Sequence, residues 1–340
     1  MDELRNRAIL LNSRPNGYPS QSNFKIIESD IPEINPGEFI VKILWLSVDP
    51  YMRGRMSDKK SYAPSVGIGD VMVGAGVGKI ISSRNNEFEV GTIVEGRFGW
   101  QEYAISNGTN ARKISISEKD SSQALGVLGM PGLTAYFGLF NLGKPKPNDT
   151  VVISAASGAV GSVVGQLAKL TGCKVVGIVG SDIKASYITN ELNFDNAINY
   201  KEQNVNQELQ NMCPSGIDIY FDNVGGETLE TVLENLAFRA RIIVCGQISQ
   251  YNLYDDEIAH GITNFRNILT NQVTVEGFIV SRFSADFPQA FEYLENLFSE
   301  GKLKAKEDII TDLENVPTAL LRVLTGENFG KQIVKISENN

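Results

Sequence analysis

Residues 150–179 read TVVISAASGAVGSVVGQLAKLTGCKVVGIV, and this stretch decides the fold of the chain. The apolar run at 150–154 predicts a buried strand, and the β-branched run at 174–179 predicts a second strand. Between them, apolar residues at 160–171 recur with helical spacing. A strand, a glycine turn, a helix and a further strand form one βαβ unit, so the stretch predicts a parallel sheet.

The glycine turn between the first strand and the helix indicates a dinucleotide site. Gly158 lets the backbone approach a pyrophosphate, and Gly161 allows the helix to pack closely on the strand. The start of the helix, at Ala159 and Val160, offers free N–H groups and a partial positive charge to phosphates. Ala156 replaces the first glycine of the common GxGxxG pattern. The alternative, a tight turn whose small residues serve packing alone, therefore stays open.

The end of the second strand decides which dinucleotide is preferred. Sites for NAD usually place a carboxylate about 20 residues after the turn, where it binds the ribose 2′-hydroxyl. Here Gly180 and Ser181 follow the strand, and Asp182 comes slightly late. Ser181 and the nearby cation Lys184 suit a 2′-phosphate, and Tyr200 is placed to flank the adenine or that phosphate. The pattern favours NADPH, although Lys184 as an ordinary solvated helix residue is the alternative.

The chain changes character near residue 122. Before it, apolar and β-branched runs at 39–46, 71–81, 91–99 and 102–105 predict short strands and a compact, partly open β-barrel. After it, residues 122–142 have helical spacing, with Pro131 and Gly132 as an internal break, and strands then alternate with helices. That alternation is typical of a doubly wound parallel sheet. From about residue 303 the chain returns to strand-like pieces such as 332–336.

Composition and charge exclude several classes of function. A chain of 340 residues suits two domains. A formal net charge of −9 argues against a nucleic-acid partner, because phosphate binding needs clustered Lys and Arg. Neither the N-terminal residues nor any later stretch has an apolar run long enough for a signal peptide or a membrane span. We expect a cytoplasmic protein without a membrane or nucleic-acid partner.

Metal-ligating side chains are scarce. His260 is the one histidine, and Cys173, Cys213 and Cys245 lie far apart in the sequence. Zinc sites need His, Cys and carboxylates at close, characteristic spacings. The sequence therefore predicts no metal site, and it leaves little room for Cys/His or Ser/His nucleophilic chemistry.

Five motifs in order along the chain resemble the medium-chain dehydrogenase/reductase family. They are SVDPYMRG at 47–54, the run 155–174, DNVGG at 222–226, CGQISQYN at 245–252 and GENFGK at 326–331. More narrowly, they resemble the zinc-independent alkenal double-bond reductases, which include leukotriene B4 12-hydroxydehydrogenase/15-oxoprostaglandin 13-reductase. Zinc-dependent relatives carry Gly-His-Glu where this chain reads Gly69-Asp70-Val71.

The resemblance implies a fold and an assembly. It implies a GroES-like, β-rich domain at 1–122 and 310–340, a Rossmann domain at 123–309, and usually a homodimer. It also implies where a bound NADPH would lie. The pyrophosphate would contact Ala159, Val160 and Gly161; the adenosine phosphate side would contact Lys184 and Tyr200; and the nicotinamide side would contact Asn223, Cys245, Gly246, Gln247, Ile248, Ser249, Tyr251, Phe278, Ile279, Val280 and Asn328.

Without a metal to polarise a carbonyl, alcohol oxidation is the poorer hypothesis. A conjugated C=C–C=O substrate removes the difficulty, because hydride adds to the β-carbon and negative charge collects on the carbonyl oxygen. A tyrosine hydroxyl aimed at that oxygen stabilises the charge. Tyr251 and Tyr51 are the candidate catalytic residues, with a cleft-wall role as the alternative for each. A quinone reductase of the same superfamily and a non-catalytic NADPH-binding protein are the competing functions.

Overall fold

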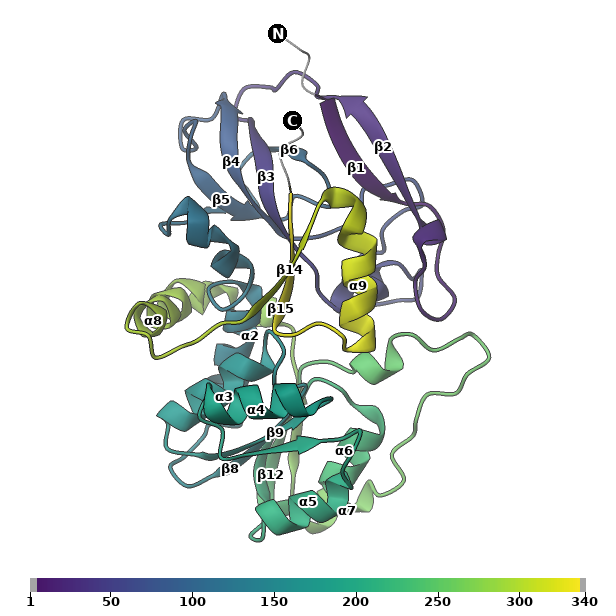
Figure 1. The fold of residues 1–340 in the computed structure, drawn as a ribbon, viewed down its shortest axis with the longest axis vertical. Helices are drawn as coiled ribbons and strands as arrows, with labels where there is room; N and C mark the ends of the chain where they lie inside the picture. Colours follow the sequence, from purple (N-terminus) through teal and green to yellow (C-terminus); the bar gives the residue numbers. More distant parts are fainter. Residues whose placement is uncertain (1–4, 337–340) are drawn as a thin grey trace. The chain divides into compact units, whose positions relative to one another are not determined.

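The computed structural model describes residues 5–336, which form two compact units (Figure 1). The first unit comprises 5–125 and 307–336, and the second comprises 126–306. The domain boundaries expected from the sequence, after 122 and after 309, therefore differ slightly from the division in the structure. The expected pairing of a β-rich unit with a parallel-sheet unit is confirmed.

The first unit is built on a seven-stranded sheet and a separate two-stranded one. The large sheet has the order β14-β15-β3-β4-β5-β7, and β6 pairs with β3. The smaller sheet joins β1 and β2 in antiparallel register. The sheet begins at β14 and ends at β7, so the order leaves it open. The strands are β1 Arg5–Leu11, β2 Phe24–Asp30, β3 Phe39–Ser47, β4 Gly76–Ser83, β5 Ile93–Gly96, β6 Tyr103–Ser106, β7 Ala111–Lys113, β14 Glu307–Thr311 and β15 Lys331–Lys335.

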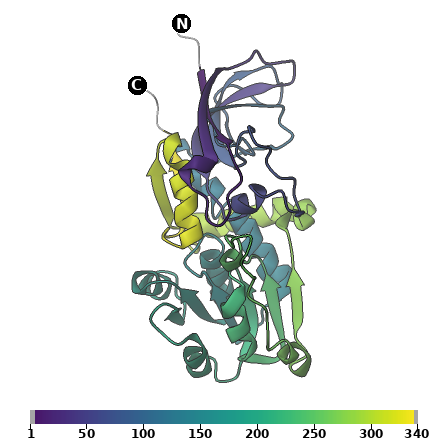
Figure 2. The same ribbon diagram turned by 90° about the vertical axis from the view of Figure 1, so that its right-hand side faces the viewer.

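The C-terminal part of the chain returns to the first unit, as expected from the sequence. β15 pairs antiparallel with β3, with Ile333 opposite Ser47, and parallel with β14. Figure 2 shows α9 (Val316–Thr325) beside these C-terminal strands. This helix is absent from the sequence interpretation, although its buried residues Val316, Leu320 and Val323 have helical spacing. It ends where Gly326 adopts a φ of +72°, a backbone conformation that favours glycine.

The second unit is a six-stranded parallel sheet. Its order is β10-β9-β8-β11-β12-β13, so the direction of strand progression reverses between β8 and β11. The strands are β8 Thr150–Ser154, β9 Lys174–Val179, β10 Asn196–Asn199, β11 Ile217–Asp222, β12 Leu236–Val244 and β13 Thr274–Gly277. The α-helices are α2 Met130–Phe137, α3 Gly161–Leu170, α4 Asp182–Asn190, α5 Val205–Met212, α6 Gly226–Leu233, α7 Arg266–Thr270 and α8 Phe287–Ser299.

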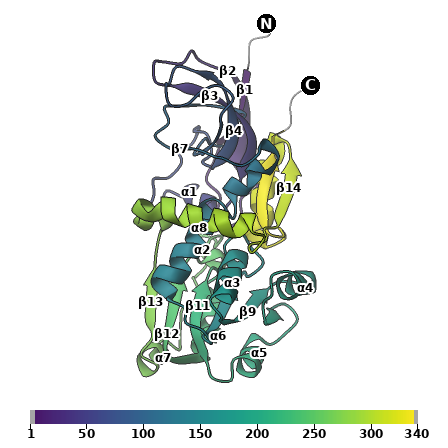
Figure 3. The same ribbon diagram turned by 90° about the vertical axis from the view of Figure 1, so that its left-hand side faces the viewer.

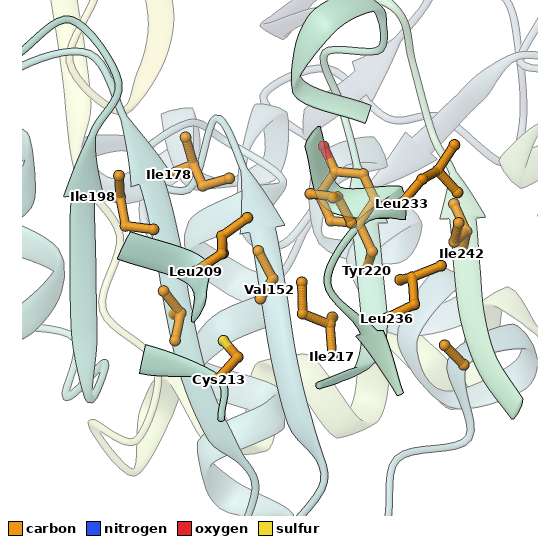
Figure 4. Packing of buried hydrophobic residues seen from close by; sticks show 13 residues of the cluster. Val152, Ile178, Ile198, Leu209, Cys213, Ile217, Tyr220, Leu233, Leu236 and Ile242 are labelled. Carbon is orange, nitrogen blue, oxygen red and sulfur yellow. The ribbon is translucent and has the colours of Figure 1, made fainter. Parts of the chain in front are cut away.

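Both faces of the parallel sheet are covered, because successive side chains of a strand point to opposite faces. On one face, Val152 and Tyr220 pack with Leu209 of α5 and Leu233 of α6 (Figure 4). On the other face, Phe221 approaches Gly138, at the start of the helical turn η3 (Gly138–Gly143). Figure 3 shows α8 packed against α2. Aromatic rings of the two helices meet at this contact. All five residues of β8 are buried, as the apolar run predicted.

The helical region before β8 differs from its prediction. The break lies at 126–129, and Pro131 belongs to the first turn of α2 rather than to an interruption. A proline is tolerated there because the first-turn N–H groups have no partner within the helix. A Cβ on Gly132 would lie 1.9 Å from the carbonyl oxygen of Val127, so a glycine is needed. Among residues 5–336, no single helix is long and apolar enough to cross a membrane, while one bent pair, at 118–125 and 130–143, passes on length and composition.

Candidate active site

The turn between β8 and α3 is tightly wound. Ala155 adopts a φ of +50°, and its carbonyl oxygen accepts a 2.9 Å hydrogen bond from the Gly158 N–H. A Cβ on Gly161 would lie 2.6 Å from the same oxygen and 2.9 Å from the Cα of Ala156. Glycine at 161 is therefore required for the helix to approach the end of the strand.

Three backbone N–H groups at this turn are unused. Among the residues that the structure describes, those of Ala159, Val160 and Gly161 donate to no other residue, and the first helical bond is made by Ser162 to Gly158. No side chain caps the start of α3, which is ten residues long. Free N–H groups at the positive end of a helix form an anion site, so the turn fits a pyrophosphate.

β9 ends at Val179, and Gly180 and Ser181 follow it, so no carboxylate stands at the strand end itself. Ser181 caps α4, because its hydroxyl oxygen accepts from the Lys184 N–H at 3.4 Å. Asp182 accepts a 2.8 Å hydrogen bond from the side chain of Asn199. The Tyr200 ring lies within 3.1 Å of the position that a Cβ on Gly180 would take. Gly180 and Ser181 are small residues, and Lys184 supplies a cation in the first turn of α4, so this surface fits a 2′-phosphate.

Asn223 joins the ends of β8 and β11, the two strands between which the strand progression reverses. Its side-chain amide donates to the Ser154 carbonyl oxygen at 2.7 Å, and its backbone N–H donates to the Ser154 hydroxyl at 2.8 Å. Beneath it, the fully buried Asp222 accepts from the hydroxyl of Tyr220 and from the N–H of Gly225. Ligands of open α/β sheets bind at this edge. Asn223 therefore lies at this edge of the sheet, and its amide group is used to join two strands.

Tyr251 is held by its own loop. Its hydroxyl oxygen accepts from the Gln247 N–H at 3.2 Å, and a Cβ on Gly246 would lie 3.2 Å from that oxygen. The loop is tied to the β11–α6 turn through Ser249, whose hydroxyl donates to the Val224 carbonyl oxygen at 2.6 Å, and through the Ile248 N–H. Burial raises the pKa of Tyr251, so the hydroxyl keeps its proton at neutral pH.

The cofactor contacts predicted at Cys245 and at residues 278–280 are not simple side-chain ligands. Burial, together with the smaller effect of the Asp222 charge, raises the pKa of the Cys245 thiol to about 12, so the thiol is unsuited to nucleophilic chemistry. Phe278 is buried and packs towards Gly138 and Phe283, whereas Ile279 is exposed. Val280 begins the next helical turn. Val280 also packs against a buried cluster, so Ile279 is the exposed side chain of these three residues.

The first unit carries Tyr51 and Asn328. Tyr51 is the first residue of α1 (Tyr51–Arg55), where Pro50 is the N-cap. Burial raises the pKa of Tyr51, and the charge of Asp49 raises it further. Asn328 donates from its side-chain amide to the Gly330 carbonyl oxygen at 2.9 Å. Arg53 is buried and donates to the Gly17 carbonyl oxygen at 2.8 Å, which is a structural role.

Sequence reasoning missed two features of the site. Asp222 stands in the quoted DNVGG motif, yet its role as a buried acceptor for the β11–α6 turn was not proposed. Lys201 directly follows Tyr200, and its side chain also lies over Gly180. The imidazole of His260 contacts the Glu230 carboxylate at 2.6 Å, and the His260 backbone N–H donates to the Gln250 side chain at 3.1 Å. Across residues 5–336, no three His, Cys, Asp or Glu side chains form a group able to hold a metal ion.

Comparison with known proteins identifies the family. Residues 7–114 match the family model described as the N-terminal domain of oxidoreductase, and residues 159–296 match the one described as zinc-binding dehydrogenase. The chain is 41% identical over 343 residues to the 2-alkenal reductase (NADP(+)-dependent) of Nicotiana tabacum, covering 99% of both chains. It is 44% identical over 324 residues to prostaglandin reductase 1 of Rattus norvegicus, covering 94% of this chain and 95% of that one.

A solved structure agrees with these relatives. CurA from Vibrio vulnificus, in complex with NADPH, superposes with a TM-score of 0.93 at 42% identity, covering 98% of this chain and 100% of that one. The resemblance inferred from the five motifs is thereby confirmed. The chain belongs to the zinc-independent medium-chain dehydrogenase/reductase family.

Proposed function

We propose that this protein reduces the carbon–carbon double bond of α,β-unsaturated aldehydes or ketones, with NADPH as the hydride donor. The observation that carries the proposal is the hydroxyl of Tyr251. It accepts the Gln247 N–H, which leaves its own proton to donate, and it lies in a loop that follows the carboxyl end of β12. Relatives named for alkenals and for prostaglandins support this substrate class.

NADPH is the cofactor of this oxidoreductase. When bound, it supplies hydride to the β-carbon of the substrate. The unused N–H groups of residues 159–161 would hold its pyrophosphate, and the surface around Gly180 and Lys184 would hold its 2′-phosphate. Asp182, the first carboxylate in sequence after β9, has one of its oxygens engaged by Asn199.

The protein's own residues stabilise the charge that develops on the substrate. As hydride reaches the β-carbon, negative charge grows on the carbonyl oxygen, and a fixed hydroxyl donor lowers the energy of that state. Tyr251 is the first candidate for that donor and Tyr51 is the second. Burial raises the pKa of both, so neither loses its proton at neutral pH.

The test is NADPH oxidation with three substrates: a 2-alkenal, a conjugated enone and a quinone, with the products identified by mass spectrometry. The expected result is a saturated aldehyde or ketone. Its former β-carbon should carry one deuterium, transferred from NADPH that is labelled with deuterium at C4. Turnover of the quinone alone would favour the quinone reductase alternative. An absence of turnover with all three would favour a cofactor-binding protein without catalysis.

We also propose that the protein is a homodimer that associates through β13. This strand is an outer strand of its sheet, and outer strands present unpaired backbone groups to other chains. Around it Val275, Phe265 and Leu269 are 46%, 65% and 77% exposed. Sedimentation equilibrium should give twice the mass of the chain, and Val275→Lys should shift the protein towards the monomer. A monomeric unmutated protein would refute the proposal.

A further inference from the structure

A buried ion pair in the first unit joins Lys331 to Asp49, which lies two residues before Tyr51 in the sequence. The Lys331 ammonium group is 2.7 Å from Oδ1 of Asp49, and the two side chains are 4% and 7% exposed. Lys331 also donates to the Val48 carbonyl oxygen at 2.9 Å. The Ser47 hydroxyl donates to the other carboxylate oxygen of Asp49. The carboxylate is therefore held at both oxygens, and the ammonium group is held by two acceptors.

Stability alone does not explain this arrangement. Removing two charges from water costs more than most ion pairs return, and an apolar pair of similar size often stabilises a fold equally well. Buried ion pairs do, however, impose one geometry on the segments that they join. Here the joined segments are the end of β3 and the beginning of β15, which are more than 280 residues apart in sequence.

The pair holds the turn that presents Tyr51. The Asp49 carbonyl oxygen accepts from the Met52 N–H at 3.1 Å, so Asp49 is also part of the first turn of α1. On the far side of this short helix, Arg53 is fixed to the Gly17 carbonyl oxygen. The helix is five residues long, too short to be rigid by itself. Its orientation, and with it that of the Tyr51 ring, therefore depends on contacts with the rest of the unit, and these two anchors are among them.

The carboxylate of the pair also acts electrostatically on Tyr51. Asp49, Arg97, Tyr62 and Arg55 are the charged and titratable groups that act on the Tyr51 hydroxyl, and Asp49 has the strongest effect among them. Lys331 balances the negative charge of Asp49. Loss of Lys331 would leave an unbalanced carboxylate beside a hydroxyl that must donate a hydrogen bond.

We propose that the Asp49–Lys331 ion pair is a positioning device that sets the geometry of the Tyr51 hydroxyl for its interaction with the substrate. The proposal rests on the function proposed above and assigns Tyr51 a part in it. Lys331 and Asp49 do not touch the substrate; they act through Tyr51.

The test is a double-mutant cycle on kcat for an enal at saturating NADPH. Asp49→Asn combined with Lys331→Met replaces the pair by neutral side chains of similar size. We expect this variant to lower kcat about tenfold or more, because misplacement of a catalytic group by about 1 Å can cost about a hundredfold. In a Tyr51→Phe background the same double substitution should change kcat less than about twofold. NADPH affinity, measured by fluorescence titration, should stay within about twofold in every variant.

Controls separate positioning from general damage. Asp149 and Arg241 form an ion pair in the second unit, and their neutral replacement by Asn and Met measures the cost of losing an ion pair elsewhere. Ser47→Ala removes only one hydrogen bond to Asp49 and makes the same test if the neutral pair fails to fold. We expect it to lower kcat by a smaller factor, again only when Tyr51 is present.

Two outcomes would overturn the proposal. One is an equal fall of kcat with and without the Tyr51 hydroxyl, and the other is an unchanged kcat in the neutral-pair variant. Failure of the proposed function is distinguishable, because it would appear in the unmutated protein as an absence of turnover with enals and enones.

Discussion

Removal of the Tyr251 hydroxyl tests the proposed chemistry most directly. In Tyr251→Phe the ring stays and the oxygen that accepts the Gln247 N–H is lost. Gln247 is exposed, so water can take over as the acceptor for its N–H. The cost to the free energy of unfolding should therefore stay within the value of one ordinary hydrogen bond, about 1 kcal/mol.

The effect on catalysis should be much larger than the effect on stability. A donor aimed at a developing oxyanion contributes about 10²–10³-fold in kcat, equivalent to about 3–4 kcal/mol. We expect kcat for an enone to fall by about a hundredfold. NADPH affinity should change little, because the loop stays tied to the β11–α6 turn through Ser249 and Ile248.

The assay is NADPH oxidation under saturating cofactor, with the melting temperature and the NADPH dissociation constant measured on the same preparations. Tyr254→Phe is the matched control, since Tyr254 lies three residues further along the same loop and is 48% exposed. A kcat for Tyr251→Phe within about threefold of the control would refute the donor role. An equal loss of NADPH affinity and kcat would instead assign Tyr251 to cofactor binding.

Three further predictions follow from the second unit. Lys184→Ala should raise the KM for NADPH about tenfold or more and that for NADH less than about twofold, because a charged hydrogen bond contributes about 1.5–3 kcal/mol; equal changes would contradict the 2′-phosphate assignment. Gly161→Ala should lower the free energy of unfolding by about 1–3 kcal/mol and weaken NADPH binding, whereas Gly261→Ala, whose Cβ meets nothing within 4 Å, should do neither. The pKa of Glu230 is lowered from 4.5 to about 2, mainly by hydrogen bonds from Thr263 and also by His260. The charged form of Glu230 therefore stabilises the fold above about pH 4.5, and this contribution is lost as the pH falls towards 2. Chemical denaturation between pH 2 and 6 should show a weaker pH dependence in Glu230→Gln, and identical curves would contradict this.

Local sequence patterns predicted those helices and strands whose buried residues recur at a regular spacing. β8, α3 and β9 each have an apolar run of the right length, and glycines and small residues mark the turn between them. The same signal was present but unused in α8, where Phe287, Phe291 and Leu294 have helical spacing. Pro131 was misread because a proline signals both the interruption and the start of a helix, and only its neighbours in space distinguish the two.

The candidate site was predictable as far as it depends on contiguous residues. The free N–H groups of residues 159–161 and the missing carboxylate after β9 follow from a few neighbouring positions. The role of Asn223 was harder to predict, because its amide group bonds to Ser154, 69 residues earlier in the chain. Sequence reasoning identified the residue and its strand end, but it could not show that the amide is already occupied.

The sequence by itself determined the βαβ unit at 150–179, the preference for NADPH and the scarcity of metal ligands, because each depends on residue types and short spacings. Only the tertiary structure decided that Lys331 lies against Asp49 and that Asp222 supports the turn carrying Asn223. These contacts join segments whose separation in sequence carries no local signal. Burial then turns them into specific interactions, since a polar or charged side chain removed from water is stable only next to a matching partner.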